Sequence, residues 1–189
     1  MKKAILFLGN GYEEIEALAV VDFLRRAEIT VDMVSITGDL ETISAHGVHI
    51  KADKLVEEVN PADYDAVITP GGIPGSTQLA ENETVLSCLQ SFYKEKRLVA
   101  SICASPLALE AACLAAKIKG TCYPGFEDQV HFKEFSEDIV VKDGNVITSR
   151  GPATAPYFAL AIIEALEGKE KAVEIRNGTL LPLVEAAVK

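Results

Sequence analysis

Short, nearly continuous apolar runs alternate along this chain with longer segments whose apolar residues recur at helical spacing. The run at 3–8 is followed by such a segment at 13–27. A short apolar run predicts a buried strand, and the three-to-four-residue spacing predicts a helix with one apolar face. The same signals predict strands at 31–35, 48–51, 66–69 and 98–102 and helices at 84–94, 104–116 and 157–166.

One turn signal near the C-terminal end refines this pattern. Asp143-Gly144 separates the apolar runs 139–141 and 146–148, which predicts a β-hairpin. Strands that are apolar on both faces and alternate with helices are typical of parallel sheets covered on both sides. We therefore predict a single α/β domain over 1–189, with a doubly wound, mostly parallel sheet between two layers of helices.

The composition narrows the class of protein. With 189 residues, 49% of them hydrophobic, the chain can bury a sizeable core. Its net charge of -10, without clusters of Lys or Arg, argues against nucleic acid or an anionic membrane as a partner. The apolar run Ala4–Leu8 is too short for a signal peptide or a membrane span. We expect a cytoplasmic protein.

The cysteines give no sign of a metal site. Cys88, Cys103, Cys113 and Cys122 occur without CxxC spacing and without clustered histidines. This pattern argues against a zinc site and against a disulfide scaffold. We expect reduced thiols, no metal and no cofactor, and most of these cysteines should be inert buried residues.

Cys103 differs from the other cysteines because it lies between the predicted strand 98–102 and the predicted helix 104–116. A helix N-terminus favours an anion, which predicts a lowered pKa for the Cys103 thiol. A sharp strand-to-helix turn would also push the side chain out of the sheet. A small residue is equally expected wherever a strand and a helix pack closely, so position alone leaves both interpretations open.

A second loop that follows a strand carries three carboxylates. Glu13, Glu14 and Glu16 open a predicted helix, where carboxylates ordinarily complement the helix dipole. Glu16 lies beside the apolar Ala17 and Val20, so we expect it to point inward. A carboxyl turned toward a thiolate would have to share a proton with it, and the pair would titrate as a unit.

A third loop contains Pro70-Gly71-Gly72. Such a sequence forms tight turns, but glycines also let backbone amides approach a ligand closely. Together with the amide of Ala104, these amides could form a cavity for a developing oxyanion. All three loops are expected at the carboxyl edge of the sheet, where ligands bind in such folds.

Four segments in order along the chain carry a family resemblance: "GYEEIEA", "VITPGG", "ASICASP" and "TSRGPATAPYFALAIIEAL". Together they resemble the DJ-1/ThiJ/PfpI superfamily, and most of all its DJ-1-like branch. The resemblance implies a flavodoxin-like α/β sandwich that forms homodimers. It further implies that Cys103 is the reactive nucleophile, that Glu16 is its hydrogen-bonded partner, and that amides of Gly71, Gly72 and Ala104 line the pocket.

The resemblance also marks a second group of positions. Arg26 and Arg150 match family positions associated with the dimer and the surroundings of the site, and His46 lies in a segment that comes near the dimer interface in relatives. Tyr123 stands where some relatives have a histidine. The protease-like branch has a histidine directly after the cysteine, where this chain has Ala104. Without that proton donor, peptide hydrolysis is disfavoured.

The function that the resemblance implies is a cofactor-independent glyoxalase in carbonyl and oxidative stress defence, with deglycase activity as an extension. Cys103 would add to the aldehyde of methylglyoxal, and Glu16 would move a proton between the two carbons before hydrolysis releases lactate. The alternative is a non-enzymatic redox-sensing stress protein or chaperone that acts through oxidation of Cys103. Both hypotheses use the same residues, so both stay open. An amidase or thiazole-biosynthesis enzyme is a third interpretation.

Overall fold

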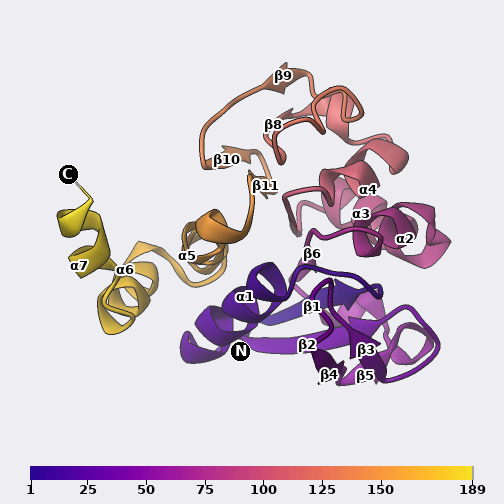
Figure 1. Ribbon diagram of the computed structural model, residues 1–189, viewed down its shortest axis with the longest axis horizontal. Coiled ribbons are helices and arrows are strands. Elements are labelled where there is room, and N and C mark those ends of the chain that lie inside the picture. Colours follow the sequence, from indigo (N-terminus) through magenta and orange to yellow (C-terminus); the bar gives the residue numbers. More distant parts are fainter. Residues whose placement is uncertain (189) are drawn as a thin grey trace.

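A seven-stranded sheet runs through the computed structural model, which describes residues 1–188 (Figure 1). Its strands in spatial order are β10 (Val140–Asp143), β11 (Val146–Ser149), β7 (Leu98–Ile102), β6 (Ala66–Thr69), β1 (Lys3–Leu8), β2 (Thr30–Ser35) and β5 (Lys54–Leu55). All neighbouring strands are parallel except β10 and β11, which form an antiparallel hairpin at one edge. The predicted hairpin at Asp143-Gly144 and the mostly parallel sheet are confirmed.

Helices cover both faces of this sheet. One face carries α1 (Glu14–Arg26) and α5 (Ala155–Glu167), with α6 (Lys169–Gly178) packed against α5 and α7 (Leu181–Ala187) against α6, and the other carries α2 (Gly75–Glu81), α3 (Glu83–Lys94) and α4 (Pro106–Ala111). Two small sheets lie outside these layers, one of β3 (Glu41–Ile43) and β4 (His49–Lys51), the other of β8 (Lys119–Gly120) and β9 (Glu134–Phe135). The fold is therefore the expected flavodoxin-like three-layer α/β arrangement.

The central strand β1 shows how the core is divided. Ala4, Leu6 and Leu8 point into the cluster under α1 and α5, whereas Ile5 and Phe7 point into the cluster under α3 and α4. All five are at most 1% exposed. Successive side chains of a strand face opposite sides, so a strand covered on both sides must be apolar throughout.

The predicted helix 104–116 is wrong in its extent. The helix α4 covers only Pro106–Ala111, because left-handed residues stand on both sides of it. Cys103 has a φ of 65° and Cys113 a φ of 58°, and neither conformation can continue a right-handed helix. The apolar pattern continues through this segment because the chain stays buried, although it is no longer helical.

Several short elements have no clear signal in the sequence. The helix α2 begins Gly-Ser-Thr-Gln, and half of the residues of α6 are charged, so neither shows a strong apolar stripe. The strands β8 and β9 are two residues long each, too short for a periodic pattern. These elements are therefore stabilised by their contacts with the rest of the fold and not by a pattern in their own sequence.

The three loops singled out in the sequence meet at one edge of the sheet, as expected. The strands β7, β6 and β1 are adjacent and parallel, so the residues that follow them, beginning at Cys103, Pro70 and Gly9, emerge on the same side. The described chain contains no helix with the length and apolar composition needed to cross a membrane.

Candidate active site

Cys103 occupies a sharp turn directly after β7. Its φ of 65° places it in the left-handed region, which costs a non-glycine residue of the order of 1–3 kcal/mol. Two backbone hydrogen bonds hold the turn: the Cys103 amide donates to the carbonyl of Ser149 at 3.0 Å, and its carbonyl accepts from the amide of Tyr123 at 2.9 Å. The residue is 8% exposed, so most of its surface is shielded from solvent.

Glu16 lies in the first turn of α1 and is completely buried, which confirms that it points inward. Its Oε2 accepts a hydrogen bond of 2.7 Å from the amide of Gly71. Its Oε1 is also buried and has no conventional hydrogen-bond partner within residues 1–188. A buried carboxyl with one unpartnered oxygen is costly, and such groups concentrate at functional sites.

Gly71 is the residue that lets the carboxyl and the thiol meet. A Cβ on Gly71 would lie 2.5 Å from Glu16 Oε2, 2.9 Å from Cys103 Sγ and 2.5 Å from Cys103 Cβ. Any side chain here would therefore displace both functional groups. The adjacent Gly72 has a φ of 90° and is packed against backbone atoms of the loop before α1, so it too must be glycine.

The titration of the two groups is linked. Burial raises the pKa of Glu16 to about 7, although the interactions of the carboxyl with Cys103 and with the Gly71 amide lower this pKa. Burial and the neighbouring Glu16 carboxylate raise the pKa of the Cys103 thiol above its usual range. The prediction of a lowered pKa for Cys103 is therefore wrong for this arrangement, because α4 is short and desolvation outweighs its N-terminal field.

Two backbone amides act in the opposite direction on the sulfur. The amides of Ala104 and Gly72 face Cys103 Sγ and lower the pKa of the thiol. The amide of Gly71 does not join them, because it is bound to Glu16. Of the three amides suggested by the sequence, two are thus placed to stabilise negative charge near the sulfur, and the third fixes the carboxyl.

A small pocket of about 240 Å³ opens beside Cys103. It is lined by Glu13, Gly72, Ile73, Cys103, Ala104, Tyr123, Phe126 and Pro152. The rings of Tyr123 and Phe126 meet edge to face with centroids 6.4 Å apart. Drug-sized ligands occupy pockets of roughly 300–1,000 Å³, so this one suits a smaller molecule. Sequence reasoning missed Ile73, Phe126 and Pro152, which offer no chemical signal of their own.

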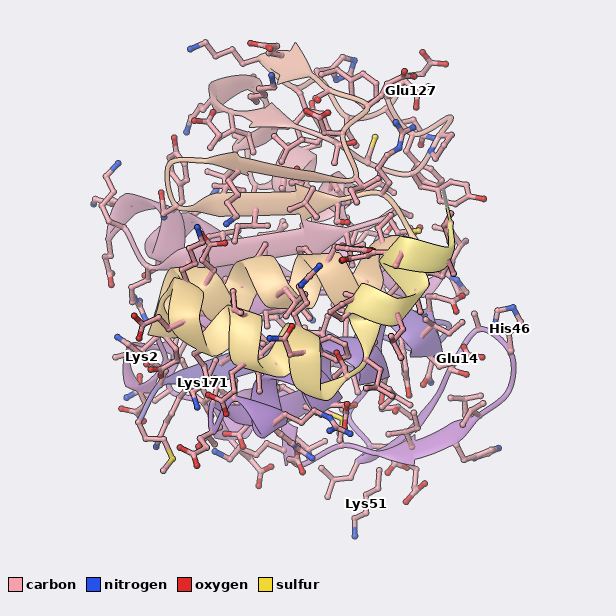
Figure 2. The ribbon with its side chains drawn as sticks, turned by 90° about the vertical axis from the view of Figure 1, so that its left-hand side faces the viewer. Lys2, Glu14, His46, Lys51, Glu127 and Lys171 are labelled. Carbon is pink, nitrogen blue, oxygen red and sulfur yellow. The ribbon has the colours of Figure 1, made fainter. Side chains whose placement is uncertain are left out.

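His46 is paired with residues of its own chain. Its Nδ1 lies 2.9 Å from Glu14 Oε1 and 3.7 Å from Glu13 Oε2, and these carboxylates raise the pKa of the imidazole (Figure 2). Glu13 also lines the pocket, whereas His46 itself is not one of the lining residues. Within residues 1–188, these three side chains form the one group whose potential metal-ligating atoms converge, all within 4.8 Å of one another.

The two arginines lie outside the pocket lining. Arg26 Nε donates to Asp22 on the exposed face of α1 at 2.7 Å. Arg150 donates to the carbonyl of Glu137 at 3.2 Å, and its guanidinium carbon lies 5.9 Å from the centre of the Phe135 ring. Both guanidinium groups are thus bound to groups that do not line the pocket.

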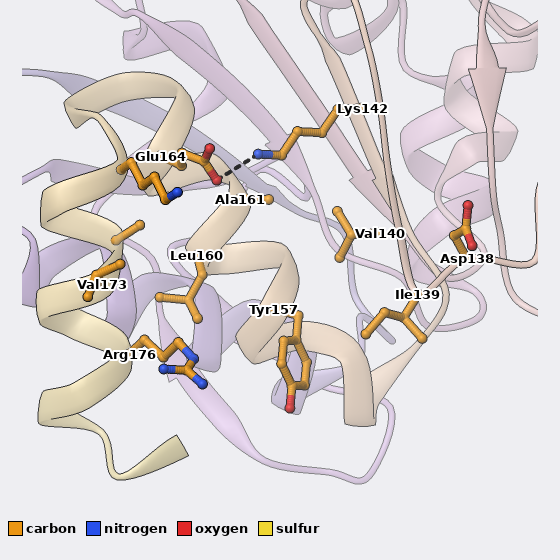
Figure 3. A pocket seen from close by; sticks show the side chains of 12 residues that line it. Asp138, Ile139, Val140, Lys142, Tyr157, Leu160, Ala161, Glu164, Val173 and Arg176 are labelled. Carbon is orange, nitrogen blue, oxygen red and sulfur yellow. Dashed lines mark hydrogen bonds and ion pairs between the residues drawn. The ribbon is translucent and has the colours of Figure 1, made fainter. Parts of the chain in front are cut away.

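A larger hollow lies apart from this site. It holds about 590 Å³ between α5, α6 and β10, and it shares no lining residue with the Cys103 pocket (Figure 3). Its rim includes the ion pair of Lys142 and Glu164, 2.9 Å apart. None of the cysteines lines it, so it offers no nucleophile of the kind found at Cys103.

Comparisons with known proteins agree with this geometry. The family model of the DJ-1/PfpI family matches residues 2–165. The chain is 39% identical to a zebrafish (Danio rerio) protein named Parkinson disease protein 7 homolog, over 95% of this chain and 97% of the relative. It is 35% identical to glutathione-independent glyoxalase DJR-1.2 of Caenorhabditis elegans, covering 96% of each.

A solved structure supports the same assignment. Oxidized DJ-1 of Toxoplasma gondii superposes with a TM-score of 0.92 at 34% identity, over 95% of this chain and 98% of that one. The family match covers the buried glutamate, the glycine loop and the cysteine turn, all within residues 2–165. This chain belongs to the DJ-1/PfpI family, in its DJ-1-like branch.

Proposed function

We propose that this protein is a glutathione-independent glyoxalase that converts methylglyoxal to lactate with Cys103 and Glu16 and without a metal or cofactor. The carrying observation is the buried Glu16 carboxyl, which is held by the Gly71 amide beside the Cys103 thiol and has a pKa near neutrality. A general acid or base works best when its pKa lies close to the working pH. The glyoxalase name of the nematode relative supports the same activity.

The first step is addition of the thiol to the aldehyde. Since burial keeps the Cys103 thiol protonated, sulfur attacks as Glu16 accepts its proton, and an S–C bond forms at the aldehyde carbon. Negative charge develops on the aldehyde oxygen at the same time. The amides of Gly72 and Ala104 are close enough to the sulfur to stabilise that charge until Glu16 passes the proton on to the oxygen, which gives a hemithioacetal and leaves the carboxylate free to act as a base.

The second step moves hydrogen between the two carbons. Glu16 removes the proton from the carbon bonded to sulfur and a proton returns to the neighbouring carbon, so one carbon is oxidised and the other reduced within the same molecule. The product is a lactyl thioester of Cys103. Water then cleaves the S–C bond and restores the thiol. The sum is methylglyoxal plus water giving lactic acid, which needs no external oxidant.

The pocket fits a small substrate with an apolar end. Ile73, Phe126 and Pro152 give it apolar walls, whereas the polar groups gather at the sulfur. Ile73 and Tyr123 are 52% and 45% exposed at the mouth. We extend the proposal to deglycase activity, because a glyoxal adduct on a protein or nucleotide could reach the sulfur only through such an open mouth.

Replacing each partner separates catalysis from simple trapping of the aldehyde. Cys103→Ser should abolish turnover, because a serine hydroxyl without a strong base is a poor nucleophile. Glu16→Gln should keep the Gly71 hydrogen bond but lower kcat by about 10²–10⁴-fold, since an amide cannot carry the proton. Lactate formation from methylglyoxal without glutathione is the measurement. Loss of only one aldehyde per wild-type cysteine, with the Gln variant equally effective, would rule out the enzyme.

The raised pKa of Glu16 predicts a pH-dependent stability. In the folded state the carboxyl holds its proton up to about pH 7, against its ordinary value of 4.5. The proton on Glu16 therefore adds its full contribution to the free energy of unfolding below pH 4.5. This contribution, roughly 1–3 kcal/mol, is lost as the pH rises through 7. Urea unfolding from pH 5 to 8 should show wild type losing stability relative to Glu16→Gln. Parallel curves for the two proteins would contradict the shared proton.

A second candidate function is a redox-sensing stress protein or chaperone, favoured by the protonated carboxyl beside the sulfur. Mild peroxide should convert the Cys103 thiol to the sulfinic acid, consuming two peroxides and releasing two waters. Peptide mass spectrometry should find this product far ahead of oxidation at Cys88, Cys113 or Cys122. Glu16→Gln should change its rate of formation. Identical oxidation with and without the carboxyl would show that the two groups are not coupled.

We also propose that the protein is a homodimer. Apolar side chains are exposed on α1 at Ile15 (53%) and Leu18 (39%) and on the adjoining β3–β4 segment at Ile43 (41%). Such a patch is typical of an interface, and two-fold dimers are the commonest oligomers. Light scattering at micromolar concentration should give a dimer mass, and Leu18→Asp should give monomers while Val173→Asp, at a comparably exposed position, does not. A monomeric wild type would refute the proposal.

A further inference from the structure

Three buried hydroxyls form a cluster next to the Cys103 turn. Thr69, Ser101 and Ser105 are each 0% exposed. Ser101 Oγ lies 2.9 Å from Thr69 Oγ1 and 2.8 Å from Ser105 Oγ, and Ser105 Oγ lies 3.1 Å from Thr69 Oγ1. Buried hydroxyls are costly unless they are hydrogen-bonded, and these three bind one another and the backbone.

Ser105 joins this cluster to the backbone at two places that matter for the site. Its Oγ accepts a hydrogen bond of 3.1 Å from the amide of Ile102, the residue immediately before Cys103. It lies 2.5 Å from the carbonyl oxygen of Thr69, the last residue of β6. One hydroxyl therefore links the end of β7, directly before Cys103, to the end of β6. The loop after β6 contains the Gly71 amide that binds Glu16.

The three protons can be arranged so that each is used. The hydroxyl of Thr69 donates to Ser101, that of Ser101 donates to Ser105, and that of Ser105 donates to the Thr69 carbonyl. In this arrangement Ser105 accepts from both Ser101 and the Ile102 amide and donates one bond. Its oxygen is then fully engaged, with the Thr69 carbonyl at 2.5 Å as the nearest acceptor for its proton and the Ile102 carbonyl at 2.9 Å as a second.

We propose that Ser105 is a positioning residue for the Cys103–Glu16 pair. The left-handed turn at Cys103 is strained, and it persists only if the residues on both sides are fixed. Ser105 fixes Ile102 on one side and ties the turn to the end of β6 on the other. The hydroxyl thereby holds the sulfur in register with the Glu16 carboxyl and the Gly72 amide. This inference rests on the geometry of the pair and goes beyond the glyoxalase reaction.

Alkylation of Cys103 by iodoacetamide as a function of pH tests this inference without any substrate. In Ser105→Ala the sulfur should move away from the Glu16 carboxyl, so the apparent pKa of the reaction should fall by about 0.5 unit or more. Cys113 serves as the reference thiol within the same molecule. The buried Cys88 should remain slow, which shows that the variant is folded.

A double-mutant cycle measures the coupling between Ser105 and Glu16 in the alkylation profile of Cys103. A hydroxyl with a purely structural role would show no such coupling. Glu16→Gln should shift the alkylation profile strongly in wild type and by less than half as much in the Ser105→Ala background, because the carboxyl and sulfur are no longer in register. Ser76→Ala is the matched control, since Ser76 is also a fully buried hydroxyl but has no hydrogen-bond partner within the described residues. Its profile should equal that of wild type.

Superimposable profiles of wild type and Ser105→Ala, or equal shifts in Ser76→Ala, would overturn the proposal. Ser105→Gly is the second variant if Ser105→Ala does not fold, because it also removes the hydroxyl from a helical backbone conformation. Failure of both to fold would assign the hydroxyl to folding alone and refute positioning. A shifted profile in a protein that never turns over methylglyoxal would retain this inference and refute the glyoxalase.

Discussion

The contact on which the site depends is the packing of the Glu16 carboxyl against Cys103 across Gly71. A hydrogen bond of 2.7 Å from the Gly71 amide fixes the carboxyl, and the missing side chain of Gly71 leaves the space that both functional groups fill. The three residues come from a helix, a loop and a strand-to-helix turn that are far apart in the sequence. The order of the central strands is what brings them to one edge of the sheet.

Burial determines the chemistry of this pair more than the helix N-terminus does. A carboxyl and a thiol removed from water both favour their neutral forms, and each carboxylate or thiolate disfavours the other. At neutral pH the thiol therefore keeps its proton, whereas the Glu16 carboxyl, with a pKa of about 7, is present in both its protonated and its ionised form. The amides of Gly72 and Ala104 lower the pKa of the Cys103 thiol, but burial and the Glu16 carboxylate raise it by more.

The surroundings limit what can reach the sulfur. The pocket of about 240 Å³ admits a small molecule, and its apolar walls come from three separate loops. The larger hollow between α5, α6 and β10 lacks a cysteine and shares no residue with it. Of the four thiols, Cys88 and Cys122 are buried away from this pocket and Cys113 is exposed, so Cys103 is the cysteine that lines it.

Apolar periodicity by itself determined the strands at 66–69 and 98–102, since a parallel strand covered on both faces must be apolar throughout. The inward direction of Glu16 followed from its apolar helical neighbours. The family motif identified Cys103, Glu16, Gly72 and Ala104 as candidates. Their roles stay proposals.

Only the tertiary structure decided the short helix α4, the occupied Gly71 amide and the raised pKa of Cys103. Each of these depends on what lies opposite in space: a left-handed turn, a carboxyl from another helix, and the depth of burial. The hydroxyls of Thr69, Ser101 and Ser105 show the same limit. In the sequence these three are ordinary small polar residues. They form a cluster only because β6 pairs with β7 in a register that places Thr69 opposite Ser101.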